Sequence, residues 1–69
     1  MTNEEFLKFV GMEFKIARIR MGLTLDQLAK LTGLSSACCG DIERGTVDGH
    51  ILSYKRIAEA LGLSMKDFV

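Results

Sequence analysis

Apolar residues recur at helical spacing along almost the whole chain of 69 residues, and no alternating run predicts a β-strand. Seven glycines and no proline divide this pattern into short segments. The spacing predicts five helices, over about residues 3–21, 24–32, 35–44, 51–61 and 64–69. We therefore expect an all-α chain, and at this length one compact domain that spans residues 1–69.

The ends of these segments carry residues typical of helix caps. Asn3 precedes two glutamates and is expected to cap the first helix. Thr24 with Gln27 three residues later predicts a capping box at the start of the second helix. Ser35 and Ser64 are expected to cap the third and fifth helices. Glycines 22, 33, 45 and 62 stand where the first four helices are expected to end.

One apolar face of each helix is expected to form the core. The expected core residues are Phe6, Val10, Phe14, Ala17, Met21, Leu25, Leu28, Ala29, Leu31, Cys39, Ile42, Ile51, Tyr54, Ile57, Ala58 and Leu61.

The first helix carries a second apolar stripe on its opposite side, which needs a second partner. This stripe consists of Phe9, Met12, Ile16 and Ile19. The last helix, with Met65, Phe68 and Val69, is one candidate to fold over it. Alternatively, the stripe or the last helix forms a dimer interface, and both arrangements can hold together.

Composition excludes several classes of protein. Cys38 and Cys39 are adjacent, so they cannot join distant parts of the fold, and they provide too few ligands for a zinc site. We expect both to be reduced, with no metal or cofactor. No apolar run is long enough to span a membrane, and no signal peptide is apparent, so we expect a cytoplasmic protein. The sequence shows no group of residues typical of acid–base or nucleophilic catalysis. It therefore predicts neither an enzyme nor a small-molecule ligand.

The most informative segment is residues 25–44, LDQLAKLTGLSSACCGDIER, where a tight turn at residues 32–34 joins two short helices. Ala29 is small enough for the two helices to cross closely, and Gly33 supplies the turn. Cys39 and Ile42 are expected to bury the inner face of the second helix of this pair. Such a pair lets its second helix enter a DNA major groove while the first spans the backbone.

Over residues 10–69 the chain resembles the lambda-repressor-like family of Cro/Xre-type helix-turn-helix regulators. The matching residues are Gly11, Arg18, the segment GLTLDQLAKLTGLS, Ile42 to Gly45, and IAEALGLSMKDF. The resemblance implies a five-helix fold whose second and third helices form the motif, and a bacterial or phage source. It also implies a structural ion pair between Arg18 and Glu43.

The resemblance further implies that the start and outer face of the third helix read DNA. The implied residues are Ser35, Ser36, Ala37, Gly40, Asp41 and Arg44, with Thr24 and Gln27 near the backbone. Further phosphate contacts are expected from Thr46 and His50, and from Lys30 or Lys55 if they face the same side. This helix departs from the family pattern because its short side chains reach few base edges. Ser36 can bond a base or phosphate, Ala37 can contact a thymine methyl, and Asp41 can accept from cytosine.

These features predict a repressor that binds a palindromic operator as a homodimer, with half-sites about 34 Å apart. One observation opposes this hypothesis: nine basic and nine acidic side chains leave no net charge, whereas small DNA-binding domains are usually basic. The local arrangement of charge matters more than the total. The alternative is a protein-interaction module of the same fold that has lost DNA readout.

Overall fold

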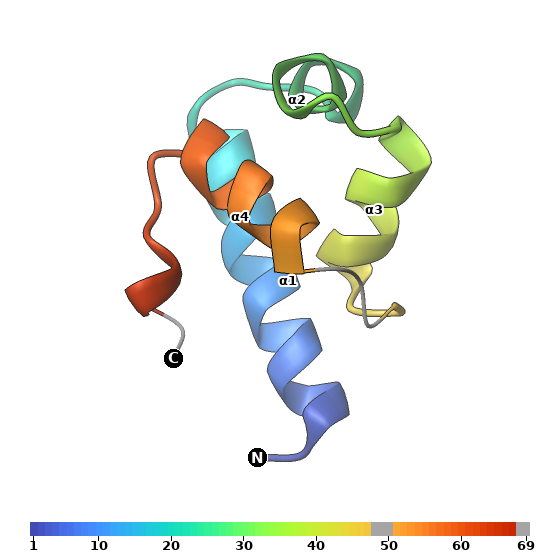
Figure 1. The fold of residues 1–69 in the computed structure, drawn as a ribbon, viewed down its shortest axis with the longest axis vertical. Coiled ribbons are helices and arrows are strands. Elements are labelled where there is room, and N and C mark those ends of the chain that lie inside the picture. Colours follow the sequence, from blue (N-terminus) through green and yellow to red (C-terminus); the bar gives the residue numbers. More distant parts are fainter. Residues whose placement is uncertain (48–50, 68–69) are drawn as a thin grey trace.

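The computed structural model describes residues 1–47 and 51–67, and within them the chain is all-helical (Figure 1). The elements in chain order are α1 (Asn3–Arg20), α2 (Leu25–Thr32), α3 (Ser36–Arg44), α4 (Ile51–Ala60) and the 3₁₀ helix η1 (Met65–Asp67). The prediction of an all-α chain is confirmed. The predicted fifth helix is represented by η1, which has three residues, and it follows Ser64, whose hydroxyl accepts from the Lys66 backbone N–H at 3.3 Å.

The N-cap of α1 lies one residue earlier than the sequence suggested. Thr2 is the N-cap, because its Oγ1 accepts from the Glu5 N–H at 3.1 Å while Glu5 Oε1 accepts from the Thr2 N–H at 2.9 Å. Asn3 is the first residue of the helix, so its assignment as the cap was wrong. The reciprocal bonding needs a glutamate three residues after the cap, and Glu5 stands at that spacing from Thr2.

The predicted ends of α2 and the start of α3 are confirmed. Thr24 and Gln27 form the expected capping box, and Ser35 Oγ accepts from the Cys38 N–H at 3.0 Å. Gly33 ends α2 with a φ of 75°, a left-handed conformation that residues with a Cβ adopt only at a cost. These three local features set the short turn between the two helices.

The buried core lies where the four α-helices meet. Its apolar members are Val10, Phe14, Leu28, Ala29, Cys39, Ile42, Tyr54, Ile57, Ala58 and Leu61, and further apolar residues pack around them, among them Phe6, Ala17 and Leu25.

Three predicted core residues are instead exposed: Met21 is 51%, Leu31 is 61% and Ile51 is 68% accessible. Met21 lies beyond the last turn of α1 as its C-cap, and Ile51 is the first residue of α4. In α2 the inward position belongs to Thr32, which is buried and one helical turn after Leu28. The Thr32 hydroxyl donates to the Leu28 carbonyl at 2.9 Å, so its burial leaves no polar atom unsatisfied.

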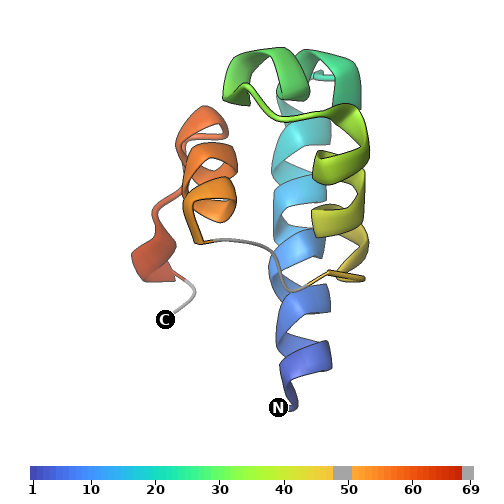
Figure 2. The ribbon, with the colours of Figure 1, turned by 45° about the vertical axis from the view of Figure 1, so that its right-hand side comes forward.

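Helix α1 packs closely against α3, and Gly11 makes this possible. A Cβ atom at Gly11 would lie 2.4 Å from the carbonyl oxygens of both Ile42 and Glu43. The two backbones therefore touch, which fixes the position of α3 relative to α1. In the view of Figure 2, α3 lies on one side of α1, and α4 with the segment that follows it lies on the other.

Candidate nucleic-acid interface

Helices α2 and α3 form the expected helix-turn-helix pair, with α3 along one edge of the molecule (Figures 1 and 2). Ala29 of α2 and Cys39 and Ile42 of α3 are buried, so the inner faces of both helices pack in the core. The outer face of α3 faces solvent. A helix held in this way can enter a groove of duplex DNA without rearrangement of the core.

Most of the residues predicted to contact DNA are accessible. Thr24, Gln27, Ser35, Ala37, Arg44 and Thr46 are exposed, Ser36 and Asp41 are partly buried, and Gly40 is buried. His50 lies outside the described residues.

Gly40 is buried because the Arg44 side chain lies over it. A Cβ atom at Gly40 would stand 3.1 Å from Arg44 Nη1, and Arg44 Nη2 donates to Asp41 Oδ1. The acidic group on the outer face of α3 is thus paired with the cation one turn later. The pair removes much of the repulsion that an isolated Asp41 would exert on phosphate, and it holds the guanidinium along the helix surface.

Asp26 also belongs to this surface, although the sequence analysis did not include it. The Ser36 hydroxyl donates to Asp26 Oδ1, which connects the first turn of α2 to the first turn of α3. The hydroxyl oxygen of Ser36 can still accept a hydrogen bond. No sequence motif relates positions 26 and 36, because their contact depends on how the two helices cross.

The two residues expected near the DNA backbone are engaged in their own cap. Thr24 Oγ1 accepts from the Gln27 N–H at 3.1 Å, and Gln27 Oε1 accepts from the Thr24 N–H at 2.8 Å. The Gln27 Nε2 group forms no hydrogen bond with the described residues, and an amide N–H is a suitable donor to a phosphate oxygen.

Arg18 and Glu43 form the ion pair that the resemblance implied, and it connects α1 to α3. Arg18 Nε donates to Glu43 Oε2 at 2.8 Å and its Nη2 to Glu43 Oε1 at 3.2 Å. A third N–H, on Nη1, donates to the Leu23 carbonyl at 2.7 Å. This bidentate geometry is the strong form of an arginine–carboxylate contact, and it holds the loop before α2 as well.

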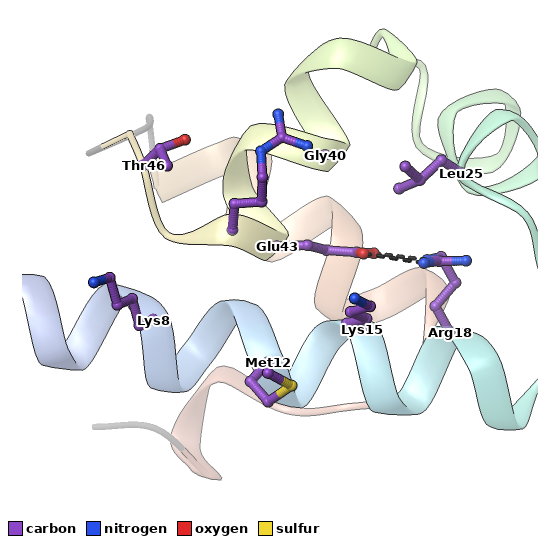
Figure 3. A pocket seen from close by; sticks show the side chains of 9 residues that line it. Lys8, Met12, Lys15, Arg18, Leu25, Gly40, Glu43 and Thr46 are labelled. Carbon is purple, nitrogen blue, oxygen red and sulfur yellow. Dashed lines mark hydrogen bonds and ion pairs between the residues drawn. The ribbon is translucent and has the colours of Figure 1, made fainter.

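A groove of about 600 Å³ lies beside this ion pair, between α1 and α3 (Figure 3). Its lining residues are Lys8, Met12, Lys15, Arg18, Leu25, Gly40, Glu43, Arg44 and Thr46. Figure 3 shows the two lysines on the α1 side and Thr46 on the α3 side. The sequence analysis did not assign Lys8 or Lys15 a role, because helical spacing alone does not show which face of α1 lies next to α3.

The second apolar stripe of α1 remains accessible: Phe9, Met12, Ile16 and Ile19 are all exposed. Met65 packs against the core and, with Leu63 and Ser64, lies beside α4. Phe68 and Val69 lie outside the described residues, so their expected position over the stripe stays a prediction. Ile51 and Leu52 form a further exposed apolar pair at the start of α4.

The two cysteines are free thiols with different surroundings: Cys38 is partly buried and Cys39 is fully buried. Burial raises the pKa of the Cys39 thiol, which is also 3.9 Å from Thr32 Oγ1. In the described parts of the chain, no three His, Cys, Asp or Glu side chains are grouped so that they could hold a metal ion.

Across residues 1–47 and 51–67, none of the helices combines the length and apolar character that crossing a membrane requires.

Comparison with known proteins supports the motif. A family model described as helix-turn-helix, the HTH_3 model, matches residues 14–68. Among solved structures, the chain is similar to the restriction-modification controller protein C.AhdI from Aeromonas hydrophila, with a TM-score of 0.81 and 26% sequence identity. That alignment covers 94% of this chain and 97% of the controller protein. The sequence matches none of the curated proteins with which it was compared.

Proposed function

Because the chain belongs to the Cro/Xre-type helix-turn-helix family and is a DNA-binding transcriptional regulator, we propose that it is a repressor that binds a palindromic operator as a homodimer. The observation that carries this proposal is the position of α3. Its inner face is buried in the core, its N-terminus is capped by Ser35, and its outer face is polar and accessible. One contiguous buried core supports treating residues 1–69 as a single domain. We further propose that this domain acts in the cytoplasm, where the DNA of a bacterial cell lies.

In the proposed complex the first turn of α3 lies in the major groove. Ser36 bonds a base edge or a phosphate, and Ala37 packs against a thymine methyl group. Asp41 and Arg44 meet the DNA as a pair. Arg44 can turn from Asp41 to a phosphate or a guanine, which leaves Asp41 to accept from a cytosine amino group. These few contacts give modest base discrimination, so the shape of the DNA contributes part of the specificity.

Dimerisation is supported by apolar surface that one copy leaves exposed. Ile16 and Ile19 on α1, and Ile51 and Leu52 on α4, are all accessible. Met12 is exposed as well, but it lines the groove between α1 and α3. A two-fold symmetric pair would bury the same patch on both copies. It would also present two α3 helices to half-sites about 34 Å apart, which makes the operator palindromic.

The test is selection from random-sequence duplex DNA at two salt concentrations, with sequencing of the retained fraction. We expect a palindromic site whose affinity falls steeply as salt rises, because phosphate contacts release counterions. Ala37→Glu, at an exposed position of α3, should abolish retention, while Leu31→Glu, at an exposed position of α2, should leave it unchanged. Sedimentation of the complex should give two protein chains per site. If the protein retains no DNA sequence even at low salt, the proposal is contradicted.

The alternative, a protein-interaction module, is favoured by one observation: the Asp41–Arg44 pair leaves the outer face of α3 without a free cation among the described residues. Such a module would bind a partner with little dependence on salt. Failure of DNA selection together with salt-insensitive binding to an apolar partner surface would favour it.

A further inference from the structure

Two lysines on α1 lie beside α3, the helix proposed to read DNA, and no acid of the described residues pairs with either of them. Lys8 and Lys15 are seven residues apart, so they project from the same face of α1, about 10.5 Å apart along its axis. Both are exposed, and both line the groove between α1 and α3 (Figure 3). Within the described part of the chain, neither lysine forms an ion pair.

Packing fixes where these lysines stand relative to α3. A Cβ atom at Gly45, the residue that ends α3, would lie only 2.7 Å from Lys8 Cα, so α1 touches the end of α3 at this point. Lys15 lies one turn before Arg18, which its partly buried hydrogen bonds to Glu43 hold against α3. Both ends of the lysine row are thus anchored to the helix proposed to enter the groove.

The charge balance of the groove is positive. Among the described residues that line it, the one carboxylate is that of Glu43, which accepts both of its ion-pair bonds from Arg18. Asp41, which is not among the lining residues, is paired with Arg44, which is. Lys8 and Lys15 are left as surplus cations, although the whole chain has no net charge. Local surplus of this kind is what attracts an anionic partner.

We propose that Lys8 and Lys15 bind phosphates of the DNA strand that borders the major groove occupied by α3; this rests on the proposed operator binding. DNA, rather than another anion, is indicated because Gly40, Arg44 and Thr46 line the groove and also belong to the proposed DNA-contacting surface. The two surfaces are therefore continuous. The lysines are about 10.5 Å apart along α1, roughly the axial rise of three phosphates of one DNA strand at about 3.4 Å each, so the two can contact different phosphates. These contacts add sequence-independent binding to the little that α3 provides, because Arg44 must leave Asp41 before it can reach a phosphate.

The test compares two double variants that remove the same charge. Lys8→Gln/Lys15→Gln removes the two lysine charges that line the groove. Arg56→Gln/Lys66→Gln removes two exposed charges elsewhere, one on α4 and one on the segment after it. For each protein, affinity is measured against salt concentration on the selected operator and on a mixed-sequence duplex. Loss of two phosphate contacts should lower the slope of log affinity against log salt by about 1.8. Binding to both duplexes should weaken by 10-fold or more at about 0.1 M salt, with sequence preference unchanged.

Controls separate this role from a general charge effect or a folding defect. The α4 variant should retain the wild-type slope, and Lys8→Arg/Lys15→Arg, which preserves the charges, should also retain it. Circular dichroism melting should show that all variants fold. An unchanged slope in the groove variant, or an equal loss in the α4 variant, overturns the proposal while operator binding stands.

Two further outcomes also overturn it. Wild-type protein that binds no duplex at low salt contradicts operator binding itself, and with it this proposal. If the groove variant loses binding to a polyglutamate peptide but keeps its DNA slope, the groove is a site for an acidic protein surface instead.

Discussion

Replacing Glu43 by glutamine should remove a large part of the stability of the fold. The substitution leaves the shape of the side chain almost unchanged but removes its charge. Arg18 then keeps its positive charge on a side chain that is only 12% exposed, and it faces an amide in place of a carboxylate whose side chain is only 4% exposed. Because the Arg18 Nη1 bond to the Leu23 carbonyl holds it in place, the guanidinium cannot easily move to solvent.

The magnitude follows from the burial of the pair. An uncompensated charge left after removal of one buried partner costs about 3–5 kcal/mol. Domains of this length have a total unfolding free energy of about 3–10 kcal/mol. Since 1 kcal/mol corresponds to about 4–8 °C for a small domain, the melting temperature should fall by at least about 12 °C.

Thermal and urea denaturation of four proteins measure this effect: the wild type, Glu43→Gln, Arg18→Met and the double variant. The double variant should be more stable than either single one, because it leaves no unpaired charge, with a coupling energy above about 2 kcal/mol. The matched control is Glu59→Gln, which removes the exposed contact to Lys55 at 3.8 Å and should cost less than about 1 kcal/mol. Equal losses for Glu43→Gln and Glu59→Gln would refute the argument.

Three further predictions concern packing, turn geometry and ionisation. Gly11→Ala should destabilise the protein by about 3 kcal/mol or more in urea denaturation, because the added Cβ would overlap carbonyl oxygens of α3. A cost below about 1 kcal/mol would show instead that α1 and α3 separate easily. Gly33→Ala should cost only about 1–2 kcal/mol, since the position is left-handed but has open space around it, and a larger loss would contradict this. Iodoacetamide at pH 8 should modify Cys38 well before Cys39, because burial raises the pKa of the Cys39 thiol. Mass spectrometry measures the two rates of modification, and equal rates would be inconsistent with a buried Cys39 thiol.

A fifth prediction concerns stability in acid. The Thr2 backbone N–H that bonds Glu5 lowers the pKa of this carboxylate below its ordinary value. The capping contact therefore contributes fully above the ordinary glutamate pKa of 4.5 and is lost as pH falls through the lowered value. Glu5→Gln should flatten the stability profile in that range relative to the wild type. A profile unchanged by the substitution would show that the carboxylate is not coupled to folding.

Features determined by neighbouring residues were predictable from the sequence. The Thr24–Gln27 box, the Ser35 cap and the turn at Gly33 depend on spacings of three or four residues, and all appear as expected. The same spacing between Thr2 and Glu5 was present at the start of the chain, and the choice of Asn3 overlooked it. Local patterns therefore located α2 and α3, and with them the candidate DNA-binding surface.

Features that depend on how helices cross were not predictable in this way. The Ser36–Asp26 bond and the contact between Lys8 and Gly45 join residues far apart in sequence. The burial of Thr32 was also missed, because hydropathy favours Leu31 at the end of α2. A threonine that bonds a carbonyl of the preceding turn can occupy an inward position at little cost, which hydropathy alone does not show.

The pairing of charges also explains why net charge is a poor guide for this chain. Ion pairs engage three basic residues of the described segments: Arg18, Arg44 and Lys55. Arg18 maintains the fold, and Arg44 screens Asp41 on α3. The bases that remain are spread over the surface, and only Lys8 and Lys15 share a groove with α3. The neutral total charge therefore hides two local differences. The helix proposed to read DNA, α3, carries little net charge, and the lysine row on α1 beside it is positive. For such a surface, affinity should follow the lysine row and sequence preference should follow α3, so the two properties should be separable by mutation.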